Sequence, residues 1–294
     1  MNILDLVGNT PLVEITQVIS KPGVTVYGKL EGQNPGGSVK DRAAYGMIKG
    51  ALDRGEIKPG GLRLIEATSG NTGIALAMIA RLFGLDITLL MPDNSTAERV
   101  QTMRAFGAEV ILTPAGKGGI EYSRELADEM VAGGGYYMLN QFANPDNWGM
   151  HYKTTGPEIW RDTQGKVTHF VSSMGTTGTI MGTSRYLKEQ NPNVQIVGVQ
   201  PTDGSSIPGI RRWTPEFLPK IFEPQRVDQV IDVSEAEATA MMKRLAQEDG
   251  IFGGMSSGGA VAAAGKLLET MDEGVIVCII CDRGDRYLSS GIFE

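Results

Sequence analysis

The chain has 294 residues, of which 41% are hydrophobic and 21% are charged, as in ordinary globular proteins. Its 34 acidic and 27 basic residues give a formal charge of −7, and no basic run marks a nucleic-acid surface. No stretch approaches the roughly 20 apolar residues of a membrane span, and no basic segment followed by an apolar one opens the chain. We therefore expect a cytoplasmic protein without nucleic-acid or membrane partners.

Short β-rich runs alternate with helical segments along the chain. Strands are predicted, in order, at residues 24–30, 62–66, 87–91, 109–112, 169–173, 195–200, 227–233 and 275–281. Helices are predicted at residues 38–54, 71–83, 97–106, 120–132, 147–162, 177–189, 235–247 and 261–268. This alternation predicts an α/β protein whose mostly parallel, twisted sheets are flanked by helices.

A turn-rich break at residues 144–147 predicts two domains, residues 1–145 and 146–294. The first strands of the chain could pack on the second domain. Residues 205–224 contain four prolines and little helical periodicity, which favours a long loop that covers a binding site.

The two cysteines, Cys278 and Cys281, have the C-x-x-C spacing of a redox motif. They lie in an apolar run predicted to be a strand, where residues three apart point to opposite faces. We therefore expect two reduced thiols, at least one of them in the core. The two histidines, His151 and His169, lie far apart without acidic or cysteine neighbours at ligand spacing, so no metal site is predicted.

Four segments rich in glycine and hydroxyl side chains are predicted at strand-to-helix junctions. In the first, residues 32–42, Lys40 falls in the first turn of a helix that Ser38 could cap. The helix dipole disfavours a cation there, so the amine is expected to be neutral or covalently bound. The alternative is a solvated lysine beside Asp41.

The other three segments are residues 68–73, 172–179 and 253–260. Backbone N–H groups and hydroxyls at a helix start form a cradle for a carboxylate or a phosphate. None of the segments has the pattern of a nucleotide P-loop or a dinucleotide fingerprint. Each alone could be a tight turn, but together with Lys40 they predict one small anionic ligand in a shared crevice.

Two of these segments, residues 35–42 (PGGSVKDR) and 68–73 (TSGNTG), resemble the β-family, or fold type II, of pyridoxal-phosphate enzymes. The likeness extends over nearly the whole chain, from residues 8–12 to residues 287–289. Residues 151–160 (HYKTTGPEIW), 207–213 (IPGIRRW) and 281–287 (CDRGDRY) resemble, more narrowly, the O-acetylserine sulfhydrylases of the cysteine synthase B group. Gly253 departs from some of these relatives, which carry a cysteine at this position.

The resemblance implies roles for individual residues. Lys40 would bind pyridoxal 5′-phosphate covalently and act as the catalytic base, and Ser256 would face the pyridine nitrogen. Asn71 would contact the 3′-oxygen of the cofactor, and its phosphate would be held by Gly175, Thr176, Thr177, Gly178 and Thr179. The substrate would be bound by Thr68, Ser69, Asn71, Thr72, Gln141, Arg211 and Arg212.

The resemblance also implies an activity. The acetoxy group of O-acetyl-L-serine would be replaced by sulfide or thiosulfate, through an α-aminoacrylate, to give L-cysteine or S-sulfocysteine. Arg211 and Arg212 favour the anionic donor thiosulfate, unless they pair with acids such as Glu216 or Glu223. The relatives are homodimers, whereas docking to a serine acetyltransferase stays open. The alternatives are an eliminating enzyme similar to serine/threonine dehydratase, and a non-catalytic homologue that binds amino acids.

Overall fold

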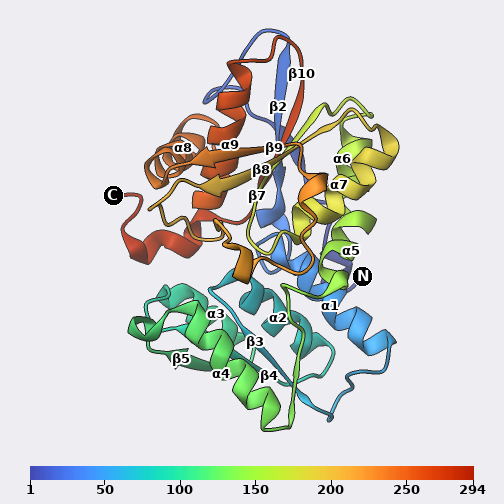
Figure 1. The fold of residues 1–294 in the computed structure, drawn as a ribbon, viewed down its shortest axis with the longest axis vertical. Helices are drawn as coiled ribbons and strands as arrows, with labels where there is room; N and C mark the ends of the chain where they lie inside the picture. The colour runs from blue at the N-terminus through green and yellow to red at the C-terminus, as the bar shows by residue number, and fades with distance from the viewer.

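Two separate sheets organise the chain, and Figure 1 shows them one above the other. The structure, a computed structural model, describes residues 1–294. The six-stranded sheet has the order β1-β2-β10-β7-β8-β9. Its strands are β1 (Leu12–Glu14), β2 (Val24–Leu30), β7 (His169–Ser173), β8 (Gln195–Pro201), β9 (Gln229–Val233) and β10 (Gly274–Ile280).

The four-stranded sheet has the order β5-β4-β3-β6, and all of its strand pairs are parallel. Its strands are β3 (Arg63–Ala67), β4 (Ile87–Pro92), β5 (Glu109–Thr113) and β6 (Tyr136–Met138). In the larger sheet only β1 and β2 pair antiparallel. The α/β architecture of two mostly parallel sheets is therefore confirmed.

Nine α-helices cover the two sheets. They are α1 (Lys40–Asp53), α2 (Asn71–Leu82), α3 (Ala97–Ala105), α4 (Ile120–Ala132), α5 (Pro145–Lys153), α6 (Thr155–Asp162), α7 (Gly178–Gln190), α8 (Glu235–Glu248) and α9 (Met255–Leu268). None of these helices is long and apolar enough to cross a membrane.

The larger sheet is buried on both faces, and β10 shows why its sequence is continuously apolar. Ile276, Cys278 and Ile280 face a core shared with α8 and α9. The alternate residues Val277 and Ile279 face a second core shared with α6 and α7. A strand with helices on both sides has no polar face, as expected for a parallel sheet.

The smaller sheet is also sandwiched, but its two sides are unequal. Residues of α1, α2 and α3 form a large apolar core with Leu64, Ile87 and Leu89 on one face. The other face is covered by α4, where Ala127 packs with Ile65 and Leu90. The helix α1 thus belongs to the core of the smaller sheet, although its first residue lies beside the larger one.

Several expected elements need correction. The helix expected at residues 147–162 is two helices, because Thr154 leaves the helical conformation with φ −128° and ψ −66°. The last helix begins at Met255 rather than at residue 261, so the fourth glycine-rich segment is largely helical and follows α8 instead of a strand. The short strands β1 and β6 were not predicted, because three residues are too few for a recognisable alternation.

Candidate active site

Lys40 is the first residue of α1, and the segment before it is fastened to the end of β10. The N–H of Val39 donates to the Cys281 carbonyl at 2.8 Å, and Ser38 forms a β-bridge with Asp282. Val39 occupies the N-cap position that was expected for Ser38, although the Ser38 hydroxyl does accept the Lys40 N–H at 3.2 Å. These contacts fix the place of Lys40 at the junction of the two sheets.

The amine of Lys40 makes no hydrogen bond or ion pair with another residue. Desolvation by burial lowers the pKa of this amine, and the nearby Cys281 and Asp282 oppose the shift only in part. The expected alternative, a solvated lysine paired with Asp41, does not occur, because Asp41 accepts the Gly36 N–H instead. An amine with a lowered pKa and no partner is suited to covalent and acid–base chemistry.

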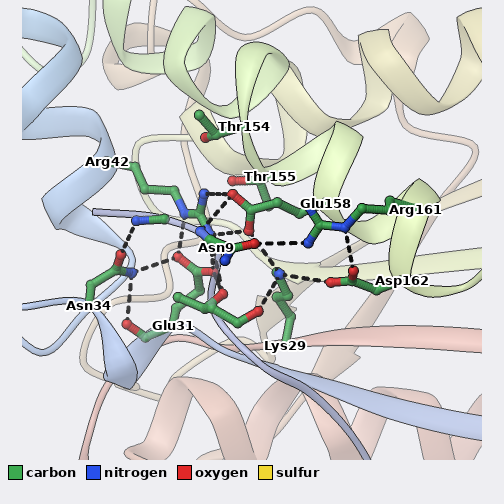
Figure 2. A network of polar contacts seen from close by, with 12 residues as sticks. Asn9, Lys29, Glu31, Asn34, Arg42, Thr154, Thr155, Glu158, Arg161 and Asp162 are labelled. Atoms are coloured by element: carbon green, nitrogen blue, oxygen red, sulfur yellow. Dashed lines mark hydrogen bonds and ion pairs between the residues drawn. The ribbon is translucent and has the colours of Figure 1, made fainter. Parts of the chain in front are cut away.

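A buried network of charged side chains holds α1 two residues beyond Lys40 (Figure 2). The fully buried Arg42 donates to Glu31 at 2.7 Å from both Nε and Nη2, and to Glu158 at 2.7 Å and 2.8 Å. Lys29 in turn pairs with Glu158 at 2.8 Å. The network ties α1 to β2 and α6, so the helix start cannot shift without uncovering buried charge.

Residues 68–72 form a polar turn between β3 and α2. The Thr68 hydroxyl accepts the N–H groups of Gly70 and Gly73, each at 3.1 Å. Gly70 has φ +154°, and a Cβ at this position would lie 2.7 Å from Arg99 Cδ, so the turn needs glycine. At the start of α2, Thr72 donates its hydroxyl proton to Gln141 Oε1 at 2.8 Å. Gln141 therefore lies beside the turn.

Asn71 opens α2 and reaches across to the larger sheet. Its amide donates to Asp282 Oδ2 at 2.7 Å, and its carbonyl oxygen accepts from Arg286. Tyr287 donates to the same Asp282 oxygen at 2.6 Å. Asp282 and Arg286 were expected only as part of the motif at residues 281–287, without a role for either side chain.

Residues 175–179 form the second polar turn, between β7 and α7. Thr177, the N-cap of α7, has φ +70°, and its buried hydroxyl has no hydrogen-bond partner. A Cβ on Gly175 would lie 2.7 Å from the Gly209 carbonyl oxygen, and one on Gly178 would overlap Asn147 Oδ1. The turn thus leaves backbone N–H groups and one unpartnered hydroxyl at the N-terminus of α7, a helix of 13 residues.

Two residues that were not predicted support this turn from α5. Asn147 donates to the Thr176 hydroxyl at 3.2 Å, and His151 Nε2 lies 3.3 Å from the Thr179 hydroxyl. Burial lowers the pKa of His151 to about 3, so this imidazole is neutral. Helix α5 begins at Pro145 with Asn144 as its cap, a start that the sequence showed only as a turn-rich break between domains.

Ser256 lies in the first turn of α9, where it is 5% exposed. Its carbonyl oxygen accepts the Ser173 hydroxyl at 2.7 Å, which places the start of α9 beside the carboxyl end of β7. Both cysteines are free, as expected: Cys278 is buried in β10 and Cys281 follows that strand. Burial raises the pKa of both thiols, so neither is a ready thiolate.

The structure does not bring Arg211 and Arg212 together at one point. Arg211 Nη1 lies 3.9 Å from Glu121 of α4, and its guanidinium lies over the Trp213 ring. Arg212 is paired with Asp203 and Asp232. The expected partners Glu216 and Glu223 are not used. Arg211 therefore lies between the larger sheet and helix α4 of the smaller one. The charge of Arg212 is balanced by two aspartates on the side of the larger sheet.

The residues at this junction fit pyridoxal phosphate. The fit rests on two unpartnered groups, the Lys40 amine and the Thr177 hydroxyl, and on a turn where glycines are required by close backbone approach. An amine for the aldehyde and a helix N-terminus for the phosphate are the two attachments that such a cofactor needs. We therefore consider the arrangement that of a vitamin B6 enzyme.

Comparison with known proteins agrees with this class. The family described as "Pyridoxal-phosphate dependent enzyme" matches residues 3–282, and the chain belongs to this family. It is 60% identical to cysteine synthase B of Pseudomonas aeruginosa over 99% of this chain and 97% of that protein. It is 58% identical to cysteine synthase B of Escherichia coli, covering 98% and 94%.

Solved structures are similar over the same length. A cysteine synthase of Entamoeba histolytica has a TM-score of 0.92 at 38% identity, covering 99% of this chain and 90% of that one. An O-ureido-L-serine synthase has a TM-score of 0.92 at 36% identity, covering 99% and 94%. The likeness thus extends through both sheets.

Proposed function

We propose that this enzyme makes cysteine by replacing the acetoxy group of O-acetyl-L-serine with a sulfur nucleophile. The observation that carries the proposal is the unpartnered amine of Lys40, the first residue of α1, in a chain 60% identical to a cysteine synthase B. A protein that only bound amino acids would have no need of a lysine held in this way. An eliminating enzyme similar to a dehydratase stays the alternative, and the experiment below separates the two.

Bound pyridoxal phosphate supplies an electron sink that acidifies the Cα–H bond of an amino acid joined to it. In our proposal Lys40 holds the cofactor, and residues 175–179 bind its phosphate at the N-terminus of α7. Ser256 faces the pyridine nitrogen as a neutral partner, and Asn71 contacts the 3′-oxygen. These four contacts come from elements of both sheets, so they orient the ring across the junction.

The substrate is held by its carboxylate in the turn of residues 68–72, with Gln141 beside it. Once freed from the cofactor, the neutral Lys40 amine removes the Cα proton and acetate leaves from the β-carbon. The lowered pKa of Lys40 supports this role, because a protonated amine could not act as the base. The sulfur nucleophile then bonds to the β-carbon, and Lys40 returns the proton to Cα.

The sulfur donor is sulfide or thiosulfate, which give L-cysteine or S-sulfocysteine. Arg211 supports an anionic donor, because its only acidic neighbour, Glu121, lies at a loose 3.9 Å. A cavity of about 320 Å3 adjoins both arginines, but Lys40 and the two polar turns do not line it. Arg212 remains part of the proposal, but its pairs with Asp203 and Asp232 must first open.

The setting of the enzyme is proposed on less direct grounds. Two free cysteines are compatible with the reducing cytoplasm, where we place the reaction. We propose a homodimer from the resemblance alone.

The test is the visible absorption spectrum of the purified protein with pyridoxal phosphate, followed by titration with O-acetyl-L-serine. We expect a yellow band that shifts to longer wavelength with O-acetyl-L-serine and returns when sulfide or thiosulfate is added. Cysteine or S-sulfocysteine should form in an amount equal to the O-acetyl-L-serine consumed. A shift that decays to pyruvate without a sulfur donor would favour the eliminating enzyme. A yellow protein that does not respond would contradict the substrate.

A further inference from the structure

Glu66 is a buried carboxylate near the carboxyl end of β3, two residues before the polar turn. It is 3% exposed, and its two oxygens accept the N–H groups of Asn140 at 2.9 Å and of Gln141 at 3.1 Å. Strand pairing between β3 and β6 ends at Met138. Beyond that point the side chain of Glu66, rather than the backbone of β3, accepts the N–H groups of the residues that follow β6.

The chain turns sharply at the residues that Glu66 holds. Asn140 adopts a left-handed conformation with φ +56°, which asparagine tolerates better than most residues with a side chain but still occupies rarely. Such a conformation persists where surrounding contacts enforce it. The turn brings the side chain of Gln141 back over β3, where its Nε2 donates to the Ala67 carbonyl at 3.3 Å.

Gln141 connects the two polar turns of the site. Its Oε1 accepts the Thr72 hydroxyl at 2.8 Å, on the turn proposed to bind the substrate carboxylate. Its backbone oxygen accepts from Asn147 Nδ2 at 2.8 Å, and the same amide reaches the Thr176 hydroxyl of the proposed phosphate turn. One residue, fixed at its backbone N–H by Glu66, thus spans the junction between the sheets.

We propose that Glu66 is a positioning residue that sets the affinity for the amino-acid substrate by fixing Gln141 between the two turns. The inference rests on the proposed function, whose substrate contacts it extends. Glu66 itself touches neither the substrate nor the cofactor. With the turn held in advance, the carboxylate binds without first ordering the Gln141 side chain.

The ionised carboxylate suits this position, because in that form both of its oxygens only accept hydrogen bonds. A glutamine would turn an NH2 group toward one of the two N–H groups and leave that donor unsatisfied. The charged groups that face Glu66 come from α4: Arg124 and Asp128 line a cavity of about 50 Å3 beside it. Burial raises the pKa of Glu66 to about 7, while the Gln141 and Asn140 N–H groups and Arg124 favour the ionised form.

Steady-state kinetics of Glu66→Gln, loaded with pyridoxal phosphate, test the proposal. We expect the KM for O-acetyl-L-serine to rise about 10-fold, since the loss of a hydrogen bond to a charged group has this magnitude, while kcat changes less than about 3-fold. Glu66→Asp keeps the carboxylate on a shorter side chain, so its KM should lie between those of the wild type and Glu66→Gln. Asp128→Asn is the matched control: it lines the same cavity without a bond to Asn140 or Gln141, and its KM should equal that of the wild type.

Amide hydrogen exchange gives a second readout that does not depend on turnover. In Glu66→Gln, a peptide covering Asn140 and Gln141 should exchange faster, with or without the cofactor, and should be unchanged in Asp128→Asn. A wild type that makes no cysteine overturns the proposed function. The exchange data would still show whether Glu66 holds the backbone of Asn140 and Gln141. An active wild type with an unchanged KM in Glu66→Gln overturns the inference. So does a variant whose kcat and thermal stability fall together at constant KM.

Discussion

The chemistry of this site depends on one amine, and its setting makes the consequence of removing it specific. Lys40 has no partner in the structure, so Lys40→Ala leaves no buried charge or hydrogen bond unsatisfied. We expect cysteine formation to fall at least about 1,000-fold, as is typical when a nucleophile or base is lost. The melting temperature of the protein without cofactor should stay close to that of the wild type. Activity within about 10-fold of the wild type would contradict the role given to Lys40.

The turn of residues 175–179 offers a sharper test through a single methyl group. Gly178→Ala places a Cβ against Asn147 Oδ1, so either the turn or α5 must move. We expect the dissociation constant for pyridoxal phosphate, measured by absorbance titration, to rise about 10-fold or more, because a displaced helix N-terminus loses its alignment with the phosphate.

Gly149→Ala is the control for this substitution. Gly149 lies on α5, two residues from Asn147, and a Cβ there meets no atom within 4 Å. Alanine is favoured over glycine inside a helix, so stability should rise by roughly 0.5–1 kcal/mol with cofactor affinity unchanged. Equal affinities in both variants would show that the Gly178 contact is without consequence.

Among single residues, the sequence could identify those whose role is set by a local motif. Lys40, Asn71, Thr177 and the glycines are at the helix starts where they were expected, because a strand–turn–helix junction is readable from adjacent residues. Asn147 and His151 were missed since their partners, Thr176 and Thr179, lie 28 or more residues away along the chain. No local pattern encodes such a contact. The assignment of Lys40, Asn71 and Thr177 to the cofactor stays a prediction.

At the scale of elements, the start of α1 is held by buried charges rather than by an N-terminal cap. Replacing Arg42 with methionine would leave the buried Glu31 carboxylate without a cationic partner and Glu158 paired with Lys29 alone. We expect a loss of about 3–5 kcal/mol in the free energy of unfolding, measured by urea titration. Arg161→Met removes the exposed pair with Asp162 and an exposed hydrogen bond to Asn9, and it should cost no more than about 1 kcal/mol. Similar losses in the two variants would mean that the buried network is not what secures α1.

The same network predicts how stability depends on pH. Desolvation disfavours ionisation of Glu158, but hydrogen bonds and charge from Arg42 outweigh it and lower the pKa of this carboxyl to about 2, from 4.5. The pKa of Glu31 is lowered for the same reasons. The unfolded chain therefore binds protons first, and this stabilisation is complete above about pH 4.5 and is lost as the pH falls toward 2. Unfolding titrations between pH 6 and pH 3 should show the decline, and Arg42→Met should show a much weaker one.

The elements themselves were largely predictable, and the failures have physical causes. Strands such as β2 and β7 were placed at their observed bounds, because runs of β-branched residues end at clear turn signals. The break between α5 and α6 at Thr154 is followed at once by Gly156 and Pro157, a helix-breaking signal that the prediction of one continuous helix passed over. The early start of α9 was hidden by its glycines, which pack closely against α8: a Cβ on Gly258 would overlap the Ala238 carbonyl oxygen.

For the whole molecule, the sequence predicted two α/β domains divided near residue 145, with first strands that could pack on the second domain. Strand β2 pairs with β10 across about 250 residues, and α1, which follows it, packs in the core of the other sheet. We retain 1–145 and 146–294 as the proposed domains, with the first strands crossing to the second. Long-range strand pairing leaves no local trace, which is why composition alone could not reveal this crossing.

This division predicts that the cofactor stabilises the molecule as a unit. The proposed contacts come from α1 and α2 on one side and from α7 and α9 on the other, so bound pyridoxal phosphate joins both cores. At a concentration 100 times its dissociation constant, a ligand adds about 2.7 kcal/mol, or a rise in melting temperature of about 4–5 °C for a chain of this size. Calorimetry of the protein with and without cofactor should show this rise, and Lys40→Ala should reduce it. A melting temperature indifferent to the cofactor would mean that the two sheets are not bridged at this junction.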